Sequence, residues 1–452
     1  MELPTLKALA ADWPCLRVRS LVSDATMRIL VFSYEFLPSD APQALRVSRL
    51  MRELAACGHR VDVIAAAGPL SAVPYEVIDQ VAVHRVNPGG IDGLVAWLKR
   101  GRSVQVADSG SAVSPGHVRN GLNWKGRCIH FLRELMDAFM FPDARFLWVK
   151  AALRYARARV ADTGMPDLVI GSHEPAVGVM AAMRFSKEMN VVLVSELGDP
   201  ILATYTARRW QRRALRLERD VCEQSAAIVL TSEATAKLFD TRHAVASKLH
   251  VIPQGFDPLP HLGAEARRAN DVLRLVYTGR FYPFRDPMPL LRAVSGIEGC
   301  ECILAAPELP AHVEEFLSEG NTHCSWLGPL PHGEALRLQT GADLLVSIGN
   351  AGMTQVPGKV LEYMGSGRPI LHVRPDKEDA AAALIEAERC GYVVDASVSD
   401  ISMLLVELVA RKRNGMLEQG LVVGAAAFEK YSWRSSGQRL NSVCVLACEG
   451  RG

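Results

Sequence analysis

Short blocks of consecutive apolar residues recur along this chain, with amphipathic segments between them. The first block, 28–33, has the composition of a strand that is buried on both faces. In the segment after it, apolar residues recur at helical spacing, and the charged residues Arg46, Arg49, Arg52 and Glu53 fall mostly on other faces. Gly58 ends this segment, and a second apolar block follows at 61–66. A strand, a helix and a parallel strand form a right-handed crossover, so the pattern predicts a doubly wound α/β sheet.

Two series of such blocks predict two domains. Strands of the first series are expected at 28–33, 61–66, 81–86, 167–171, 191–195, 227–230 and 249–252, and those of the second at 273–277, 301–305, 343–348, 369–373 and 392–394. We therefore expect Rossmann-like domains over 27–257 and 271–425, joined by a linker at 258–270, in a chain of 452 residues. Ligands bind at the carboxyl ends of strands in such sheets, so the expected site is a cleft between the two domains.

Three segments do not follow this alternation. Residues 1–26 lack a regular pattern, and we expect a disordered extension there, or a true start at Met27. Residues 99–125 are rich in Gly, Ser, Asn and basic residues, which predicts a mobile surface insertion. The apolar segment 129–141 predicts either a helix that faces the core or a helix that dips into a membrane surface.

Composition narrows the classes of function. The net charge of +2 gives no reason to expect a nucleic-acid partner. The ten cysteines lack metal-ligand spacing, and neither a secretory signal nor an apolar run of membrane-spanning length is present. We therefore expect a cytoplasmic protein with reduced thiols. No Gly-x-Gly-x-x-Gly follows the first strand, which argues against a nicotinamide-dependent dehydrogenase.

The segment 355–369 contains a pattern that suits an anionic ligand. Pro357 has a fixed φ that is compatible with a first helical turn, so a helix is expected to begin there. The first amides of that helix have no partners of their own and favour an anion. Lys359 adds a positive charge, and Glu362 lies three residues further on, near the same face. Phosphate next to a carboxylate that can hold sugar hydroxyls suits a nucleotide-sugar; a plain turn before a helix is the alternative.

A second cationic segment closes the first strand of the second domain. Gly279 permits a close approach of the backbone to a ligand, and Arg280 and Arg285 place two permanent cations at the carboxyl end of the strand. Together they could grip a pyrophosphate in a bidentate manner. Two ordinary surface arginines are the alternative. The convergence of this segment with 355–369 at comparable strand ends favours a ligand.

The order of these and other short motifs resembles a known family. Besides the two segments above, the motifs are 29–38, Arg46 with 61–64, 141–143 with Trp148, 198–200, 251–257, 327–330 and 341–343. Over about 27–440 they resemble the family-4 glycosyltransferases of the GT-B fold, retaining enzymes that build bacterial polysaccharides and glycolipids. The resemblance implies transfer of a sugar from a nucleoside-diphosphate sugar to a hydroxyl of a glycan or lipid-linked acceptor, with neither a metal nor a protein nucleophile. It also implies that a last helix, 426–448, crosses back onto the first domain.

Matched position by position, the resemblance implies roles for residues of the second domain. Arg280 and Arg285 match the Arg and Lys that hold the donor pyrophosphate and stabilise the charge on the leaving group. Glu362 matches the glutamate that binds the ribose hydroxyls. Thr354 stands where many relatives have a further glutamate, which contacts the donor sugar. The expected donor-binding residues are Gly279, Arg280, Arg285, Gly352, Met353, Thr354, Lys359, Val360 and Glu362.

The expected acceptor-side residues lie in the first domain and are Asp40, Gln43, His173 and Asp199. His173 follows the strand 167–171 and is a candidate for catalysis or sugar binding, or an ordinary hydrogen-bonded loop residue. Asp199 also ends a strand, and either contacts the acceptor or caps a turn. The family often has a Gly-Gly pair where this chain has Ala41–Ala44, so a close approach to the donor is not expected at that loop.

Two alternative functions stay open at this point. One is a nucleotide-sugar 2-epimerase of the same fold, and the other is a non-catalytic polysaccharide-assembly subunit, which the departures at Thr354 and Ala41–Ala44 favour. Since acceptors of such enzymes are often lipid-linked, we expect peripheral contact with an anionic inner membrane face through 99–102 and 129–141, with 208–219 as a further candidate. An enzyme without membrane contact is the alternative.

Overall fold

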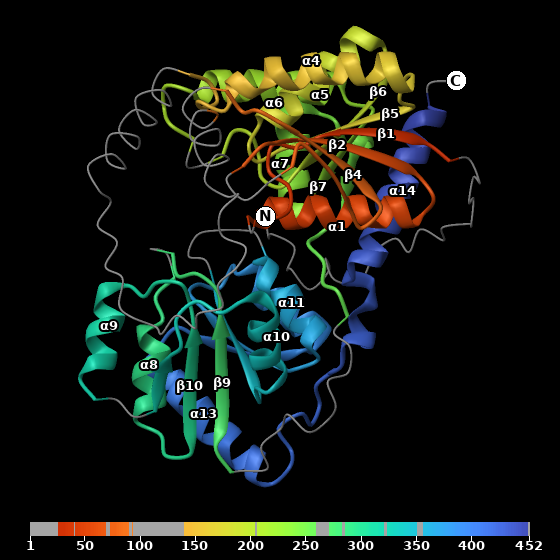
Figure 1. Ribbon diagram of the computed structural model, residues 1–452. Helices are drawn as coiled ribbons and strands as arrows, with labels where there is room; N and C mark the ends of the chain where they lie inside the picture. The colour runs from red at the N-terminus through yellow and green to blue at the C-terminus, as the bar shows by residue number, and fades with distance from the viewer. Residues whose placement is uncertain are drawn as a thin grey trace, which may run out of the picture. The chain divides into compact units, whose positions relative to one another are not determined.

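The structure is a computed structural model of the chain (Figure 1). It describes residues 26–39, 41–68, 73–89, 93, 140–203, 206–258, 271–282, 285–320, 323–349 and 356–450. The expected extension, the insertion 99–125, nearly all of the apolar segment 129–141 and nearly all of the linker 258–270 lie outside these residues, so those expectations stay predictions. The described chain divides into an N-terminal unit, which runs to Pro253 and resumes at Ser436, and a C-terminal unit, Gln254–Ser435.

The N-terminal unit is built on an eight-stranded sheet of order β3-β4-β2-β1-β5-β6-β7-β8, in which only β3 is antiparallel to its neighbour. The strands are β1 (Arg28–Phe32), β2 (Arg60–Ala66), β3 (Tyr75–Ile78), β4 (Val81–Val86), β5 (Leu168–Ser172), β6 (Val192–Leu197), β7 (Ala227–Leu230) and β8 (Leu249–Val251). All but β3 lie where the apolar blocks predict them. The strand order reverses direction between β1 and β5, and in doubly wound sheets this switch point is where ligands bind.

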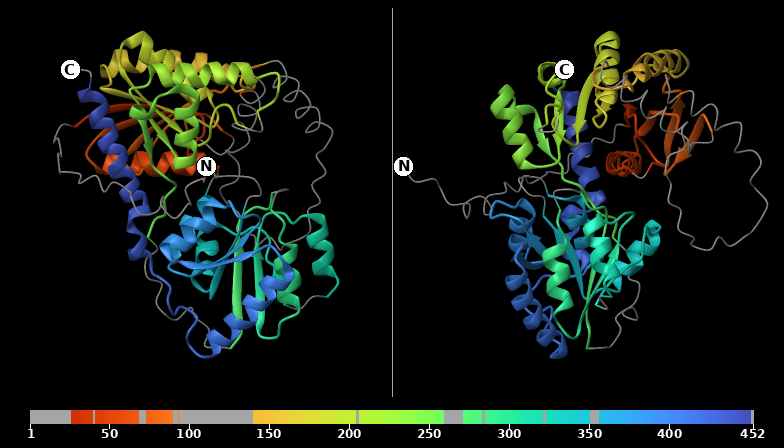
Figure 2. Two further views of the ribbon diagram at one scale, coloured as in Figure 1. Left: turned by 180° about the vertical axis from the view of Figure 1, so that it is seen from behind. Right: turned by 90° about the vertical axis from the view of Figure 1, so that its left-hand side faces the viewer.

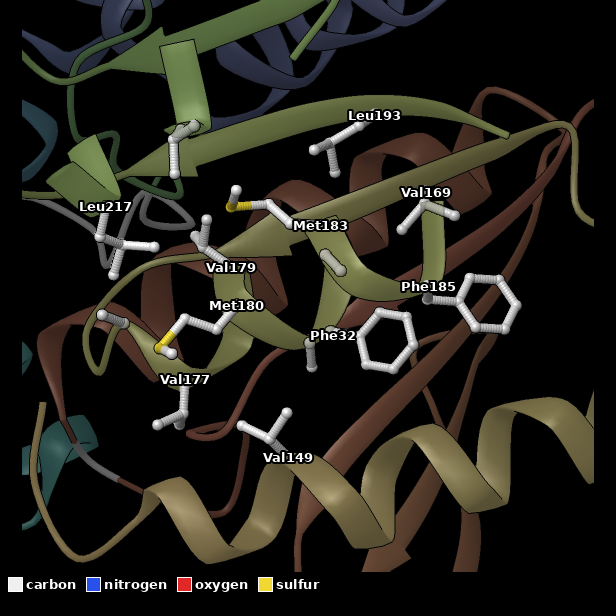
Figure 3. Packing of buried hydrophobic residues seen from close by; sticks show 14 of the residues in the cluster. Phe32, Val149, Val169, Val177, Val179, Met180, Met183, Phe185, Leu193 and Leu217 are labelled. Atoms are coloured by element: carbon white, nitrogen blue, oxygen red, sulfur yellow. The ribbon is translucent and has the colours of Figure 1, made fainter. Parts of the chain in front are cut away.

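Helices cover both faces of this sheet (Figures 1 and 2). They are α1 (Pro42–Ala56), α4 (Phe146–Thr163), α5 (Val177–Met189), α6 (Gln211–Gln224), α7 (Glu233–His243) and the 3₁₀ turn η3 (Ala246–Lys248). Successive strand residues point to opposite faces, so Phe32 packs against α5, where its ring centroid lies 5.5 Å from that of Phe185 (Figure 3). Gly178 lets α5 dock closely, because a Cβ there would clash with the carbonyl oxygens of Ser172 and Phe32.

The C-terminal unit is built on a six-stranded parallel sheet of order β11-β10-β9-β12-β13-β14. Its strands are β9 (Leu273–Thr278), β10 (Cys300–Ala305), β11 (Cys324–Trp326), β12 (Leu344–Ile348), β13 (Ile370–Arg374) and β14 (Gly391–Asp395). Its helices are α8 (Met288–Ser295), α9 (Ala311–Ser318), α10 (His332–Thr340), α11 (Gly358–Ser366), α12 (Ala380–Glu388) and α13 (Val398–Arg413). One apolar cluster lies under α8 and α13, and another lies under α11 and α12. The switch point of this sheet falls between β9 and β12.

The chain ends in a 3₁₀ helix, η5 (Ala425–Tyr431), and in α14 (Trp433–Glu449). The regular helix thus begins later than the expected residue 426. From Ser436 onward it belongs to the N-terminal unit. His59 and Asn441 are joined by a hydrogen bond of 2.6 Å, and Gly437 packs so closely on Glu53 of α1 that a Cβ there would clash. The last part of α14 is therefore an element of the N-terminal unit, on the side of α1.

Two further findings concern the described residues as a whole. None of their helices is both long and apolar enough to cross a bilayer. Their cysteines all carry free thiols, and burial raises the pKa of most of these thiols, for example that of Cys300 to about 12.

Candidate functional site

The end of β9 lies at the switch point of the C-terminal unit and is held by a buried tyrosine. The hydroxyl of Tyr363 accepts a hydrogen bond from the N–H of Thr278 at 3.0 Å and donates one to the carbonyl oxygen of Thr278 at 3.1 Å. Gly279 follows with a φ of 147°, which favours glycine. A Cβ built on Gly279 would lie 4.0 Å from Cε of Lys359. The structure therefore brings the two cationic segments, 278–287 and 355–369, side by side.

Helix α11 supplies the second half of this site. Its N-cap is Pro357, so the helix begins where the sequence predicts. Nζ of Lys359 forms an ion pair with Oε1 of Glu362 at 2.7 Å, and their side chains are 36% and 26% exposed. The same carboxylate oxygen accepts a hydrogen bond from Nε2 of Gln339 at 2.7 Å. A cation and a carboxylate, both accessible, thus lie at the switch point of the sheet.

The two arginines of the expected donor site, Arg280 and Arg285, differ in their contacts. Arg280 is exposed, and its carbonyl oxygen accepts a hydrogen bond of 3.0 Å from the hydroxyl of Tyr277. The guanidinium of Arg285 lies 5.2 Å from the ring centroid of Tyr282. Burial raises the pKa of Tyr277, while the charge of Arg285 and a hydrogen bond from it act in the opposite direction.

Val360 supports the helix and offers no group to a ligand. Its side chain is completely buried in an apolar cluster, and its N–H donates to the carbonyl oxygen of Pro357 at 2.9 Å. The expectation that Val360 contacts the donor therefore does not fit this geometry. Gly352, Met353 and Thr354 lie outside the described residues, so their expected roles stay predictions.

The switch point of the N-terminal unit contains His173, directly after β5. The ring is buried, and the backbone N–H of His173 donates to the carbonyl oxygen of Glu196 at 2.8 Å. Burial lowers the pKa of His173 to about 4, although the charges of Asp199 and Glu218 and a hydrogen bond to the backbone of Asp199 oppose this shift. The imidazole is consequently neutral at pH 7. Its Nδ1 has no hydrogen-bond partner among the described residues.

The loop after β6 lies next to His173. A Cβ on Gly198 would lie 2.7 Å from Oε1 of Gln43 and 3.6 Å from Oε2 of Glu174, so only glycine fits there without a shift of Gln43. Glu174 itself has a φ of 76°, a strained conformation for a residue with a side chain and one that occurs often at functional sites. The structure therefore brings three of the expected acceptor-side residues, Gln43, His173 and Asp199, together. Asp40 lies outside the described residues.

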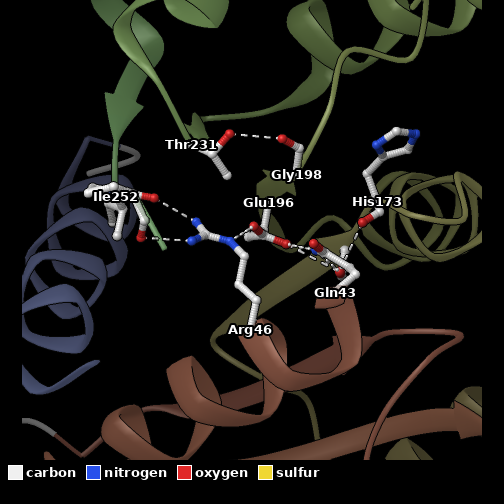
Figure 4. A network of polar contacts seen from close by, with 9 residues as sticks. Gln43, Arg46, His173, Glu196, Gly198, Thr231 and Ile252 are labelled. Atoms are coloured by element: carbon white, nitrogen blue, oxygen red, sulfur yellow. Dashed lines mark hydrogen bonds and ion pairs between the residues drawn. The ribbon is translucent and has the colours of Figure 1, made fainter. Parts of the chain in front are cut away.

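A buried polar network lies beneath these loops (Figure 4). Nε of Arg46 contacts Oε1 of Glu196 at 2.6 Å, and the two other guanidinium nitrogens donate to the carbonyl oxygens of Ile252 and Pro253 at 2.8 and 2.9 Å. Oε2 of Glu196 accepts from Nε2 of Gln43 at 2.5 Å and from the hydroxyl of Ser172 at 3.2 Å. Each ion is thus bonded on several sides.

This network corrects two expectations. Arg46 does not lie on an outer face of its helix, because its side chain is 0% exposed and is directed at Glu196. Gln43 is also buried, and its amide nitrogen is occupied by Glu196 and Ser172. Only its carbonyl oxygen is turned toward Gly198. Gln43 therefore holds the loop in place. Its amide nitrogen already donates to Ser172 and Glu196, so it does not bind the acceptor substrate in this arrangement.

Comparison with known proteins agrees with this architecture. Residues 43–255 match the model of the glycosyl transferase 4-like domain. The chain is 24% identical over 442 residues to the MMP α-(1→4)-mannosyltransferase of Mycolicibacterium hassiacum. The aligned region covers 90% of this chain and 95% of the mannosyltransferase. Similar solved structures include a sucrose-phosphate synthase from Thermosynechococcus elongatus and HepE from Anabaena in complex with UDP-glucose. The first has a TM-score of 0.63 at 14% identity, over 94% of this chain and 100% of that one. The second has a TM-score of 0.54 at 14% identity, over 92% and 98%.

Two parallel-sheet units with ligand-binding switch points define the GT-B class of glycosyltransferase folds, and this chain has that fold. Within the class, residues 43–255 of its N-terminal unit match the glycosyl transferase 4-like domain, and the chain is similar to a mannosyltransferase over most of its length.

Proposed function

We propose that this protein transfers a hexose or related sugar from a nucleoside-diphosphate sugar to a hydroxyl of a glycan or lipid-linked acceptor, with retention at the anomeric carbon. The observation that carries the proposal is the close approach of Gly279, which directly precedes Arg280, to Lys359 and its partner Glu362 at the switch point of the C-terminal sheet. A diphosphate and a ribose require this combination of cations, a close backbone and a carboxylate. The mannosyltransferase relative and the UDP-glucose complex of HepE support a nucleotide-bound hexose as the donor class.

The proposed chemistry is displacement of the nucleoside diphosphate by the acceptor hydroxyl. The bond from the anomeric carbon to the leaving phosphate breaks while a bond to the acceptor oxygen forms, and the acceptor proton passes to the leaving phosphate. Arg280, Arg285, Lys359 and the first amides of α11 stabilise the negative charge that develops on that phosphate. Because these groups supply positive charge, we propose that the reaction requires no metal. Excess EDTA should then leave the rate within about twofold, in contrast to the loss of several orders expected for a metal-assisted transfer.

His173 and Asp199 are the proposed sugar- and acceptor-side residues of the other unit. A neutral imidazole can accept a hydrogen bond from a hydroxyl or donate one to it, but it cannot act as a permanent cation. Asp199 lies beside it and can accept from an acceptor hydroxyl.

The first test is ligand binding. Differential scanning fluorimetry with UDP, GDP and ADP, followed by their glucose and mannose conjugates, should show a concentration-dependent rise in melting temperature with one nucleotide series. Arg280→Ala should abolish most of the rise, whereas the matched variant Arg292→Ala, an exposed arginine on α8 of the same unit, should not. The proposal is wrong if no nucleotide stabilises the wild-type protein, or if a nucleotide-sugar is epimerised without transfer to any acceptor.

We further propose peripheral contact with an anionic membrane through α6. Arg212, Arg216 and Arg219 are exposed on this helix, while Leu217 and Val221 on its opposite face are buried. Polybasic faces of this kind gain about 1 kcal/mol per residue near an anionic surface. Flotation with vesicles of phosphatidylglycerol and phosphatidylcholine should recover the protein at low salt and release it at high salt, and Arg212→Gln/Arg216→Gln should weaken binding. Absence of binding at low salt would reject this contact.

A further inference from the structure

We infer that Gln339 is a positioning residue for the donor. It fixes the carboxylate of Glu362 relative to the end of β9, and it thereby sets the preference of the site for the ribose of a nucleoside diphosphate. The inference rests on the proposed function, which assigns Glu362 to the ribose hydroxyls. It adds a residue outside both cationic segments.

The amide of Gln339 bridges the two halves of the site. Its Nε2 donates to Oγ1 of Thr278 at 2.9 Å and to Oε1 of Glu362 at 2.7 Å. Glu362 can only accept hydrogen bonds when it is ionised, so the nitrogen of the amide must face it and the amide cannot be flipped. One side chain therefore connects the last residue of β9, next to Gly279, to the helix that carries Lys359.

The other end of the same amide is left without a partner. Oε1 of Gln339 is buried and accepts no hydrogen bond from the described residues. The side chain is 0% exposed, and a buried acceptor without a donor destabilises a fold. For packing alone, an apolar side chain of similar size would be more favourable at this position. Both hydrogen bonds of this side chain are made by its nitrogen, to Thr278 and to Glu362.

Glu362 requires such a holder because its second partner is able to leave. Lys359 contacts the same oxygen, Oε1, from a long side chain that is 36% exposed. When Lys359 turns to a phosphate, Gln339 still holds Oε1. Oε2, which has no partner among the described residues, stays directed at the ligand and accepts from the ribose hydroxyls. Gln339 thus keeps the carboxylate oriented while its other contact changes.

The test measures the preference for ribose. Isothermal titration calorimetry of the full chain would use UDP, GDP and ADP and the 2′-deoxy form of each. We expect the wild type to bind one ribonucleotide about tenfold or more tightly than its deoxy form, since a hydrogen bond to a charged group has about that effect. In Gln339→Met this ratio should fall to about twofold through loss of ribonucleotide affinity, with deoxynucleotide affinity unchanged. Gln419→Met, an exposed glutamine of the same unit, is the matched control.

A second variant protects the test against misfolding. Gln339→Leu removes the donor next to Glu362 and offers no group that could replace it, so the ratio should fall as far as in Gln339→Met. Melting temperature without ligand reports the fold of each variant. The inference is overturned if the wild type prefers ribose and both folded variants keep that preference, or if the wild type binds a nucleotide with no preference. If the wild type binds none of the six nucleotides, the proposed function itself fails.

Discussion

The two units place polar networks at equivalent positions, the carboxyl ends of their central strands, but the networks differ in their access to solvent. In the N-terminal unit, the side chains of Arg46 and Glu196 are 0% and 1% exposed, and each has several protein partners. In the C-terminal unit, Lys359 and Glu362 are 36% and 26% exposed. A buried charge cannot lose its partner without a large cost, whereas an exposed pair gains little from its own contact. The first network therefore acts as scaffold, and the second is free to exchange partners with a ligand.

The scaffold network also fixes the point at which the chain leaves the N-terminal unit. Arg46 holds the carbonyl oxygens of Ile252 and Pro253, and Pro253 is the last residue of the unit before the chain continues into the other one. Through Glu196 and Gln43, the same arginine supports the loop at Gly198. One buried cation thus sets the geometry of an expected acceptor loop and of the exit segment.

The largest predicted effect is loss of stability on removal of one partner from the buried pair. Arg46→Met leaves the charge of Glu196 buried without compensation, and we expect the free energy of unfolding to fall by about 3–5 kcal/mol. Urea denaturation followed by circular dichroism measures this. Arg49→Met, on the same helix and 27% exposed, is the matched control and should change stability by less than about 1 kcal/mol. Adding Glu196→Met to Arg46→Met should restore part of the loss, because no unpaired charge then remains. Equal effects at Arg46 and Arg49 would contradict the scaffold role.

The next effect is a pH dependence that arises from His173. Its pKa is about 4 in the folded protein and about 6.5 when unfolded, so between these values the unfolded chain binds a proton that the folded chain does not. This contribution to stability is complete above pH 6.5 and is lost as the pH falls toward 4, with a total of about 3 kcal/mol. Denaturation at several pH values should show the slope in the wild type and a flatter curve in His173→Gln. His332→Gln, an exposed histidine, should keep the slope. The same slope in His173→Gln would exclude a buried neutral imidazole as its source.

The fold was largely predictable from the sequence because buried parallel strands are short apolar blocks. The blocks at 28–33, 61–66 and 227–230 all correspond to strands. The two strands that the pattern missed, β3 and β11, are short and lie at sheet edges, where their side chains are half exposed and no apolar block forms. The apolar pattern therefore predicts strands that are buried, and it misses strands whose side chains are partly exposed.

The site was only partly predictable, because a sequence pattern reveals only residues that lie close together along the chain. Pro357, Lys359 and Glu362 lie in one segment, so their spacing is visible in the sequence. Arg46 was misplaced on an outer face because its partner, Glu196, lies 150 residues away and no spacing reveals the pair. Gln339 belongs to neither cationic segment and lies 23 residues before Glu362. Its one available signal was its place at the end of the helix before β12, which brings it near the switch point.

A substitution in the exposed pair, Lys359 and Glu362, should affect ligand binding more than stability. Lys359→Met removes a charge that we expect to contact the donor diphosphate, so affinity for the nucleotide identified by fluorimetry should fall about 10- to 100-fold. Stability without ligand should change by less than about 1 kcal/mol. Lys430→Met is the matched control, because Lys430 forms an ion pair with Glu388 at 2.7 Å in the same unit. Calorimetry should find that Lys430→Met binds the nucleotide with an affinity within twofold of that of the wild type. If Lys359→Met also binds within twofold of the wild type, Lys359 does not contact the donor.

The smallest effect is the coupling between Lys359 and Glu362 in the absence of ligand. Their spacing is i,i+3 on one helix and both are partly exposed, so a double-mutant cycle with Lys359→Met and Glu362→Gln should give about 0.5 kcal/mol or less, decreasing further in 1 M salt. Such a low value is what allows Lys359 to leave Glu362 for a phosphate at little cost. A coupling above about 2 kcal/mol would be typical of a structural pair. In that case the two networks would be alike, and ligand binding at α11 would have to break a contact on which the fold depends.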